Sequence, residues 1–265
     1  MSTIAFTDTH PIAQTAALTR RAIVNLLREL PVLVPSLVFP LFFAALGSSS
    51  FSRATQLPGF PHVRSFLDFS LAATIVQGVI FGSVQGGSAL ATDIELGFFE
   101  RLLASPVSRT SIIVGRLGGA AALGAAQAML FTLILLPFGV RIAGGPAAFV
   151  VLGLSGAVIG VAFGGFMTAM AISTGSAEAV QGSFPLVFVS LFLSSAFFPR
   201  QTMHGWFHTV ANINPVSHLV EGIRALIIDG FTAGAVARAV GIPFVIAVIS
   251  VSLSLAALRR RLAAR

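Results

Sequence analysis

Six long apolar stretches, separated by short polar segments, constrain this chain more than any other feature. They cover residues 31–47, 67–91, 112–140, 146–174, 180–198 and 234–258. A helix needs about 20 residues to cross the hydrocarbon core of a bilayer, so such stretches predict membrane-spanning helices. Only 9% of the 265 residues are charged, against about 25% in soluble domains, which leaves too few polar groups to cover a water-facing surface. We therefore predict an all-α integral membrane protein with six spans, forming a single domain over residues 1–265.

The segment before the first span predicts an amphipathic helix that lies in the membrane interface. In a helix, one face would carry Gln14, Arg21, Asn25 and Arg28, and the opposite face Ala16, Thr19, Ile23, Leu26 and Leu30. The alternative is a simple cytoplasmic extension of the first span. That span contains Pro31, Pro35 and Pro40, so we expect a kink. Because about 30 residues precede it and no small-residue cleavage site follows, we interpret it as a retained span and not a signal peptide.

The arginines predict the orientation. Six spans put both termini on one side, which then carries ten arginines, including Arg20, Arg21 and the tail "RRRLAAR", while the other side carries six. The positive-inside rule places both termini and the segment 93–109 in the cytoplasm. The net charge of +7 then indicates a basic inner-leaflet surface, with no nucleic acid as partner. Basic residues that are all arginine, with abundant Ala and Gly, indicate a GC-rich bacterial genome, so together with the predicted spans we expect a bacterial plasma-membrane protein.

Several classes of activity are excluded by missing residues. The chain has no cysteine, so thiolate metal sites and cysteine nucleophiles are absent. It has no lysine, so it lacks the Walker A loop that binds ATP. The acids lie outside the middles of the spans, unlike those of ion-driven carriers. His204 and His208 have helical spacing but no obvious third ligand. We predict no catalytic residue, no metal and no cofactor bound by this chain.

The segment 93–109 reads "DIELGFFERLLASPVSR" and concentrates charge between the second and third spans. Written as a helix, it has one face with Asp93, Gly97, Glu100, Arg101 and Ala104, and the other with Leu96, Phe99 and Leu103. Pro106 would end this helix, and Ser108, Thr110 or Ser111 would cap the next one. The pattern predicts an amphipathic helix at the cytoplasmic surface; an ordinary solvated loop helix is the alternative.

This segment resembles the inner loop of the type-2 ABC exporter permeases, in which an acidic–Gly–x–x–Glu–x–Leu–x–x–Ser–Pro run precedes the third span. The matching residues are Glu95, Gly97, Glu100, Leu102, Leu103, Ser105, Pro106, Val107 and Arg109. The outer stretch "NPVSHLVEGIRALI" resembles another family segment through Asn214, Pro215, Glu221, Gly222 and Arg224. Within the family, the chain looks most like the permeases of daunorubicin-type resistance systems. Phe98–Phe99 departs from the common pattern and could alter the contact with an ATPase.

The resemblance implies that the segment is a coupling helix that seats in a groove of a separate ATPase subunit, which holds the ATP and Mg²⁺. Two ATPase copies would pair with two permeases, either two copies of this chain or one copy and a related permease. Glu95, Glu100 and Arg101 are the candidate polar contacts, and Phe98, Phe99 and Leu102 the candidate buried anchor. Aromatic anchors with a charged rim are common at interfaces.

The resemblance also implies a substrate pathway along the first, second and fifth spans. The candidate residues are Phe39, Phe42, Phe43, Gln77, Phe81, Gln85, Phe184, Phe188 and Phe192. Aromatic rings with scattered amides suit a hydrophobic or amphipathic substrate such as a polycyclic drug, although each phenylalanine could instead face lipid. The first rival function is export of a lipid or polysaccharide precursor, and the second is a scaffold or passive pore without an ATPase.

Two smaller patterns complete the sequence predictions. Glycines four residues apart, at Gly78, Gly82 and Gly86 and at Gly156, Gly160 and Gly164, predict close helix packing within the protomer, with a dimer seam as the alternative. In the outer segment, Glu221 and Arg224 have the spacing of an i,i+3 ion pair on a short helix.

Overall fold

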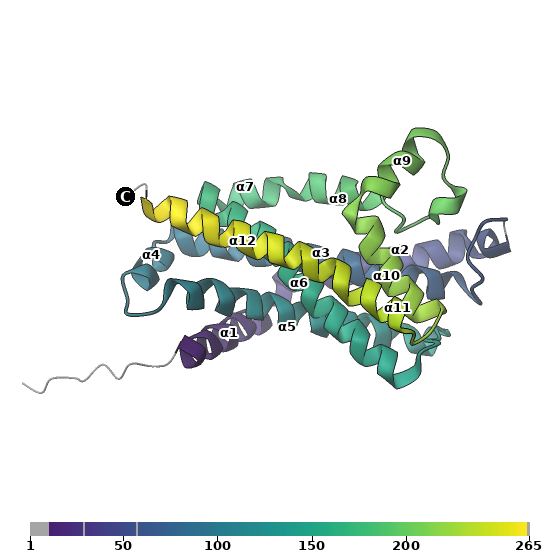
Figure 1. The fold of residues 1–265 in the computed structure, drawn as a ribbon, viewed down its shortest axis with the longest axis horizontal. Coiled ribbons are helices and arrows are strands. Elements are labelled where there is room, and N and C mark those ends of the chain that lie inside the picture. The colour runs from purple at the N-terminus through teal and green to yellow at the C-terminus, as the bar shows by residue number, and fades with distance from the viewer. Residues whose placement is uncertain (1–10, 29, 57, 264–265) are drawn as a thin grey trace, which may run out of the picture.

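The computed structural model describes residues 11–28, 30–56 and 58–263, and of these the side chains at 26–33 are not described. The regular elements in this part of the chain are all helices (Figure 1). The amphipathic pattern predicted for residues 14–30 becomes the helix α1, but its Leu26, Arg28 and Leu30 side chains lie outside the described residues. The fold class predicted from the apolar stretches, an all-helical protein, is confirmed.

The helices follow one another with short connections. In chain order they are α1 (Pro11–Arg28), α2 (Leu30–Ser50), α3 (Phe66–Glu95), α4 (Phe98–Leu103), α5 (Arg109–Leu135), α6 (Gly145–Thr174), α7 (Ala177–Gly182), α8 (Phe184–Phe192), α9 (Gly205–Ile213), α10 (Pro215–Ile228), α11 (Ala233–Val236) and α12 (Ile242–Ala263). A short π-helical segment, Ala237–Gly241, joins α11 to α12.

Four helices of the described chain are long and apolar enough to cross a membrane. They cover Phe66–Glu95, Arg109–Phe138, Gly145–Thr174 and Ala233–Ala263, and thus match the second, third, fourth and sixth predicted spans. The first predicted span falls on the shorter apolar helix Val34–Ser50, which contains Pro35 and Pro40. The fifth falls on the shorter apolar helix Ala177–Phe192, in which α7 ends at Gly182 and α8 begins at Phe184, so the helix ends before the predicted bound at residue 198. Pro185 lies in the first turn of α8 and donates no backbone hydrogen bond there.

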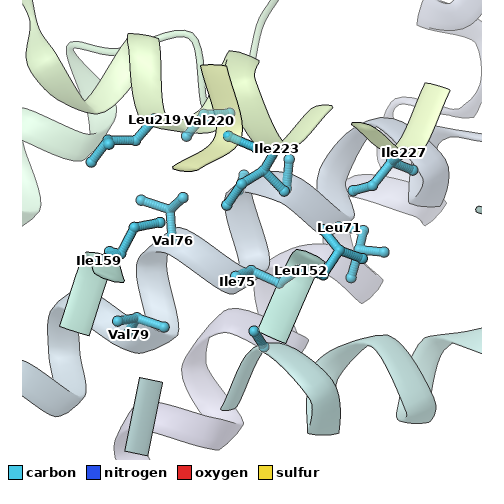
Figure 2. Packing of buried hydrophobic residues seen from close by; sticks show 14 of the residues in the cluster. Leu71, Ile75, Val76, Val79, Leu152, Ile159, Leu219, Val220, Ile223 and Ile227 are labelled. Atoms are coloured by element: carbon cyan, nitrogen blue, oxygen red, sulfur yellow. The ribbon is translucent and has the colours of Figure 1, made fainter. Parts of the chain in front are cut away.

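The helix α3 forms the centre of the bundle. In its most apolar 18-residue window, 94% of the residues are buried inside the protein. Figure 2 shows Val76 of α3 beside Ile159 of α6 and Val220 of α10, and Ile75 of α3 beside Leu152 of α6, all within one buried cluster. By contrast, only 28% of the corresponding window of α12 is buried. Polar side chains such as Ser70, Thr74, Gln77 and Ser83 of α3 are therefore buried within the protein, whereas much of α12 is left exposed.

Glycines bring α5 and α6 into close contact. A Cβ atom added at Gly156 would lie 2.4 Å from the carbonyl oxygen of Gly124, and one added at Gly160 would lie 2.3 Å from that of Ala120. Real Cβ atoms do not approach backbone oxygens this closely, so these positions require glycine. The predicted packing role within the protomer is confirmed for Gly156 and Gly160.

The elements sort to the two ends of the bundle (Figure 1). The start of α1, the helix α4 and the last turns of α12 lie at one end, and α9, α10 and α11 lie toward the other. The segment 93–109 therefore shares an end with the arginine-rich C-terminal turn of α12, as the predicted orientation requires. We call this the α4 end of the protein.

Candidate functional site

Gly97 interrupts the single helix that the sequence predicts over residues 93–104. Its φ of +68° ends α3, and α4 begins at Phe98. The left-handed conformation favours glycine, since it has no Cβ atom. This break changes the direction of the residues before it, so that Leu96, predicted on the apolar face, is 72% exposed. The prediction for Leu96 is wrong, whereas Ser108 accepts a hydrogen bond from the Ser111 amide and caps α5 as expected.

Glu95 attaches the end of α3 to α7. Its Oε1 accepts a 2.7 Å hydrogen bond from the backbone amide of Ala177, the first residue of α7. A carboxylate is favourable at a helix N-terminus, where backbone amides lack partners within the helix. In the same turn, Ser176 Oγ accepts a hydrogen bond from the Ala179 amide. Glu95 therefore belongs, in this structure, to a contact within the protomer.

Glu100 attaches α4 to α12. Its Oε1 accepts hydrogen bonds from Arg261 Nε at 3.3 Å and Nη2 at 3.1 Å. Arg261 also donates from Nη1 to the carbonyl oxygen of Ile172, near the end of α6, at 2.8 Å. Glu100 was predicted on an exposed face, but its side chain is only 25% exposed because Arg261 lies over it. The sequence could not show this pairing, since the two residues are 161 positions apart.

The aromatic residues of α4 point in different directions. Phe99 is 2% exposed and packs with Ile94, Ile112 and Ile113 in a buried cluster at the α4 end. Its ring is therefore already enclosed by this chain and is not presented to a partner in this arrangement. Phe98 is half-buried, and the guanidinium of Arg21 lies 4.0 Å from its ring centroid.

A small face of the segment 93–109 remains exposed. It consists of Glu95, Leu96, Arg101, Ala104, Pro106 and Arg109, with the partly buried Phe98 and Leu102 beside it. This set, which we call the α4 face, carries two arginines and one glutamate and contains one large exposed hydrophobic side chain, Leu96. Of the six coupling residues predicted from the sequence, only Arg101 is exposed and takes part in neither attachment.

All seven predicted pathway phenylalanines belong to one continuous aromatic cluster, defined by Phe39, Phe42, Phe43, Phe81, Phe184, Phe188 and Phe192, which Phe197 joins. Phe43 of α2 links it to the following helices, with ring centroids 6.4 Å from Phe188 and 6.0 Å from Phe192. Phe81 of α3 lies 4.9 Å from Phe184. The cluster is graded in exposure, because Phe81 is 4% exposed whereas Phe42 is 57% exposed. The consecutive helices α2 and α3 and the distant helix α8 thus bring these rings into one cluster.

An aromatic cavity of about 200 Å³ adjoins this cluster between α2, α3 and the segment that follows α8. Its lining includes Phe43, Phe51, Phe66, Phe192 and Phe197, together with Gln77. Gln77 is 1% exposed, and its Nε2 has no hydrogen-bond partner among the described residues. A buried amide without an acceptor is unfavourable, so the cavity offers a hydrogen-bond donor to a molecule that enters it.

Gln85 lies apart from this cavity, toward the α4 end. Its Oε1 accepts a 3.1 Å hydrogen bond from Gln181 Nε2, which is also 3.2 Å from Ser88 Oγ. These contacts form a second attachment between α3 and α7. The structure therefore places Gln77 with the aromatic residues, and Gln85 with the helix that Glu95 caps.

The predicted Glu221–Arg224 pair is not formed. Glu221 instead forms an ion pair with Arg200. Arg224 is 6% exposed, donates to the carbonyl oxygens of Phe69, Ser195 and Ala196, and lies 3.7 Å from the centroid of the Phe69 ring. Burial and then the charge of Arg200 lower the pKa of Arg224 to about 9, so it remains charged at neutral pH. Tertiary partners prevail over local spacing here.

Sequence reasoning missed a further ion pair at the α4 end. Arg116 Nη1 donates to Asp93 Oδ2 at 2.9 Å and joins the end of α3 to α5. Both side chains are about a quarter exposed, at 25% and 27%. An arginine about one turn inside a predicted span was the available signal, since such residues rarely lack a partner.

Comparison with known proteins agrees with the family resemblance found in the sequence. A family model described as "ABC-2 type transporter" matches residues 13–228. The daunorubicin resistance ABC transporter permease protein DrrB1 of Streptomyces coeruleorubidus is 31% identical over 202 residues, which are 74% of this chain and 66% of that protein. The putative transport permease ycf38 of Porphyra purpurea is 28% identical over 217 residues, 80% of this chain and 73% of that protein. A probable doxorubicin resistance ABC transporter permease protein DrrC of Mycobacterium tuberculosis is 22% identical over 227 residues, 83% and 78% of the two chains.

Proposed function

The chain belongs to the ABC-2 type transporter family, and on that premise we propose that it is the permease of an exporter driven by a separate ATPase. The proposed substrate is a hydrophobic or amphipathic compound of the drug type, moved out of a bacterial cell. Two permease chains and two ATPase chains would form the complex in the plasma membrane, with six spans per permease and both termini in the cytoplasm. The relatives support the drug class, since two of them are named for daunorubicin or doxorubicin resistance.

The aromatic cavity is the single observation that most favours this substrate class. Rings from several helices line it, and Gln77 adds one buried donor with no partner among the described residues. A ring-containing molecule with a carbonyl or ether oxygen would match both features, because apolar walls with few placed polar groups are typical of ligand sites. Export of a lipid or polysaccharide precursor remains the rival, because the neighbouring aromatic cluster is exposed at Phe42 and Phe192.

We further propose that the ATPase docks on the α4 face. Arg101 and Arg109 supply positive charge there, and Leu96 supplies an exposed apolar side chain, a combination that fits an acidic groove with an apolar floor. Glu95 would then transmit movement to α7 through the Ala177 amide, and Glu100 to α12 through Arg261. Because α8 follows α7 directly and carries Phe184, Phe188 and Phe192, movement of α7 would reach the aromatic cluster.

Transport by everted membrane vesicles tests the proposed function. Vesicles that contain this chain and a candidate ATPase with a Walker A motif should accumulate daunorubicin when ATP is added, and should not do so when the Walker A lysine of the ATPase is replaced. Gln77→Leu should lower the accumulation, since it removes the buried donor, whereas Gln56→Leu, at an exposed position, should leave it unchanged. Accumulation of a fluorescent phospholipid, but not of daunorubicin, would favour the rival function. Accumulation of either without an ATPase would contradict the ABC mechanism.

A further inference from the structure

A second cavity lies inside the protomer, on a different set of helices from the aromatic cavity. It has a volume of about 300 Å³ and is enclosed by α1, α3, α5 and α6. Its polar lining consists of Asn25, Ser83, Thr92, Asp93, Arg116, Gln127 and Thr168. We call it the inner cavity. None of the residues predicted from the sequence to line a pathway is in its wall, and the wall shares only Leu96 with the α4 face.

The inner cavity is long and narrow. Its wall on α3 runs from Val79 to Leu96, a distance on the order of 25 Å at 1.5 Å per helical residue. Asn25, Thr92 and Leu96, at the α4 end of the wall, are exposed, whereas Val79 and Gln127, at the far end, are buried. The cavity is therefore open at the α4 end and closed within the bundle. A modest volume over this length suits a single unbranched chain better than a fused ring system.

Gly86 keeps this space open. A Cβ atom added at Gly86, in the interior of α3, would meet nothing within 4 Å. The neighbouring glycines differ, since a Cβ at Gly82 would lie 2.9 Å from Gln127 Oε1 and one at Gly87 would lie 2.5 Å from Met167 Cβ. Glycine inside a helix is unfavourable relative to alanine. Close packing explains Gly82 and Gly87 but not Gly86, where the absence of a side chain leaves room in the cavity.

Gln127 closes the inner end with an unused acceptor. It is 2% exposed, and its Nε2 donates to Ser36 Oγ at 3.0 Å. Its Oε1 has no hydrogen-bond partner among the residues that the structure describes. A buried carbonyl oxygen without a donor is unfavourable and is normally satisfied by protein, water or ligand. The missing group at this end is therefore a hydrogen-bond donor, such as a hydroxyl or an amine.

We propose that the inner cavity binds a single-chain amphiphile whose buried end is a hydrogen-bond donor to Gln127 Oε1. Its chain would lie against the apolar wall formed by Val79, Ala120 and Leu123 and over the open surface of Gly86. The site lies within one protomer, and the proposed contact with Gln127, at the end of the cavity away from Leu96, needs no ATPase. It therefore stands or falls independently of the transport function proposed above.

Single-cysteine protection tests this site, because the chain has no native cysteine. The probes are 1-decanol, which has a hydroxyl donor, and decyl methyl ether, which does not. The purified Gly86→Cys permease in detergent is alkylated with N-ethylmaleimide in the presence of each probe. Gly182→Cys is the matched control, because a Cβ at Gly182 also meets nothing within 4 Å but the residue lies on α7, outside the inner cavity.

We expect 1-decanol to slow alkylation of Gly86→Cys several-fold, decyl methyl ether to slow it much less, and neither to affect Gly182→Cys. Adding Gln127→Leu to Gly86→Cys should remove the difference between the alcohol and the ether. If this double variant does not fold, the comparison of the two probes on Gly86→Cys still tests the site. Equal slowing at both cysteines would show only partitioning into the detergent and would overturn the site. No slowing by 1-decanol, or equal slowing by the ether, would overturn it as well.

Discussion

Reversing the charges of Glu100 and Arg261 tests how α4 is held to the bundle. Arg261 donates from Nε and Nη2 to Glu100 Oε1, at 3.3 Å and 3.1 Å, and from Nη1 to the Ile172 carbonyl oxygen at 2.8 Å. The two side chains are 24% and 25% exposed. The variants are Glu100→Arg, Arg261→Glu and the double variant that exchanges the two charges. If the pair holds α4 in place, the exchange should restore part of the free energy of unfolding that each single change removes.

The structure sets the expected size of each effect. Exposed ion pairs contribute about 0.2–1 kcal/mol, and this pair is partly buried, so we expect the upper part of that range. In Glu100→Arg, two like charges about 4 Å apart repel by at most about 4 kcal/mol at an effective dielectric constant near 20. Side-chain rotation relieves much of this repulsion, so we expect the free energy of unfolding to fall by about 2 kcal/mol in total. Arg261→Glu also removes the donor to Ile172, at about 1 kcal/mol more.

The exchange variant should regain the attraction but not the bond to Ile172. Its free energy of unfolding should therefore lie about 1 kcal/mol below that of the parent, with a favourable coupling energy in the double-mutant cycle. Thermal unfolding of the detergent-purified permease should rank the parent first, then the exchange variant, Glu100→Arg and Arg261→Glu. Co-purification with the ATPase should follow the same order, since α4 would present its exposed face correctly only when attached. If the exchange variant is no more stable than the less stable of the two single variants, the pair does not hold α4.

Three further results are expected. Arg224→Leu should lower the free energy of unfolding by about 2–4 kcal/mol, because it leaves the carbonyl oxygens of Phe69, Ser195 and Ala196 without their donor. The control, Arg53→Glu at an exposed position, should change the free energy of unfolding by no more than about 0.5 kcal/mol. Equal melting temperatures for the two variants would refute this role of Arg224. A single cysteine at the exposed Ala104 should react with an impermeant thiol reagent only in everted vesicles, and one at the exposed Ser52 should react only in intact cells. The opposite pattern would mean that the orientation is reversed. The purified chain alone should not hydrolyse ATP, because it has no lysine for a Walker A loop, and turnover that follows the permease through a second purification step would contradict this.

The sequence by itself determined the fold class, because the apolar stretches are long and charges are few. It also located features that depend on nearby residues. Ser108 caps α5 because a serine just before a helix can accept from the amide three residues later. The inner loop was identified as the candidate coupling segment because its charges and its match to the family motif are both local in the chain. Its role as a coupling helix stays a prediction.

Only the tertiary structure decided what the individual residues in that segment contact. Gly97 shifted the register of the helix and exposed Leu96, while Phe99 turned into the protein. Glu95 and Glu100 found partners 82 and 161 positions away, which no periodicity can reveal.

The same holds for polar residues inside the bundle. Gln77 and Gln127 are both glutamines in apolar stretches and differ little by sequence. The aromatic cavity and the inner cavity that they line arise from which helices meet around each side chain. Local propensity and hydropathy act over a few residues, whereas these contacts depend on how α3 is enclosed by helices distant in the chain, and that packing is what the sequence alone left undetermined.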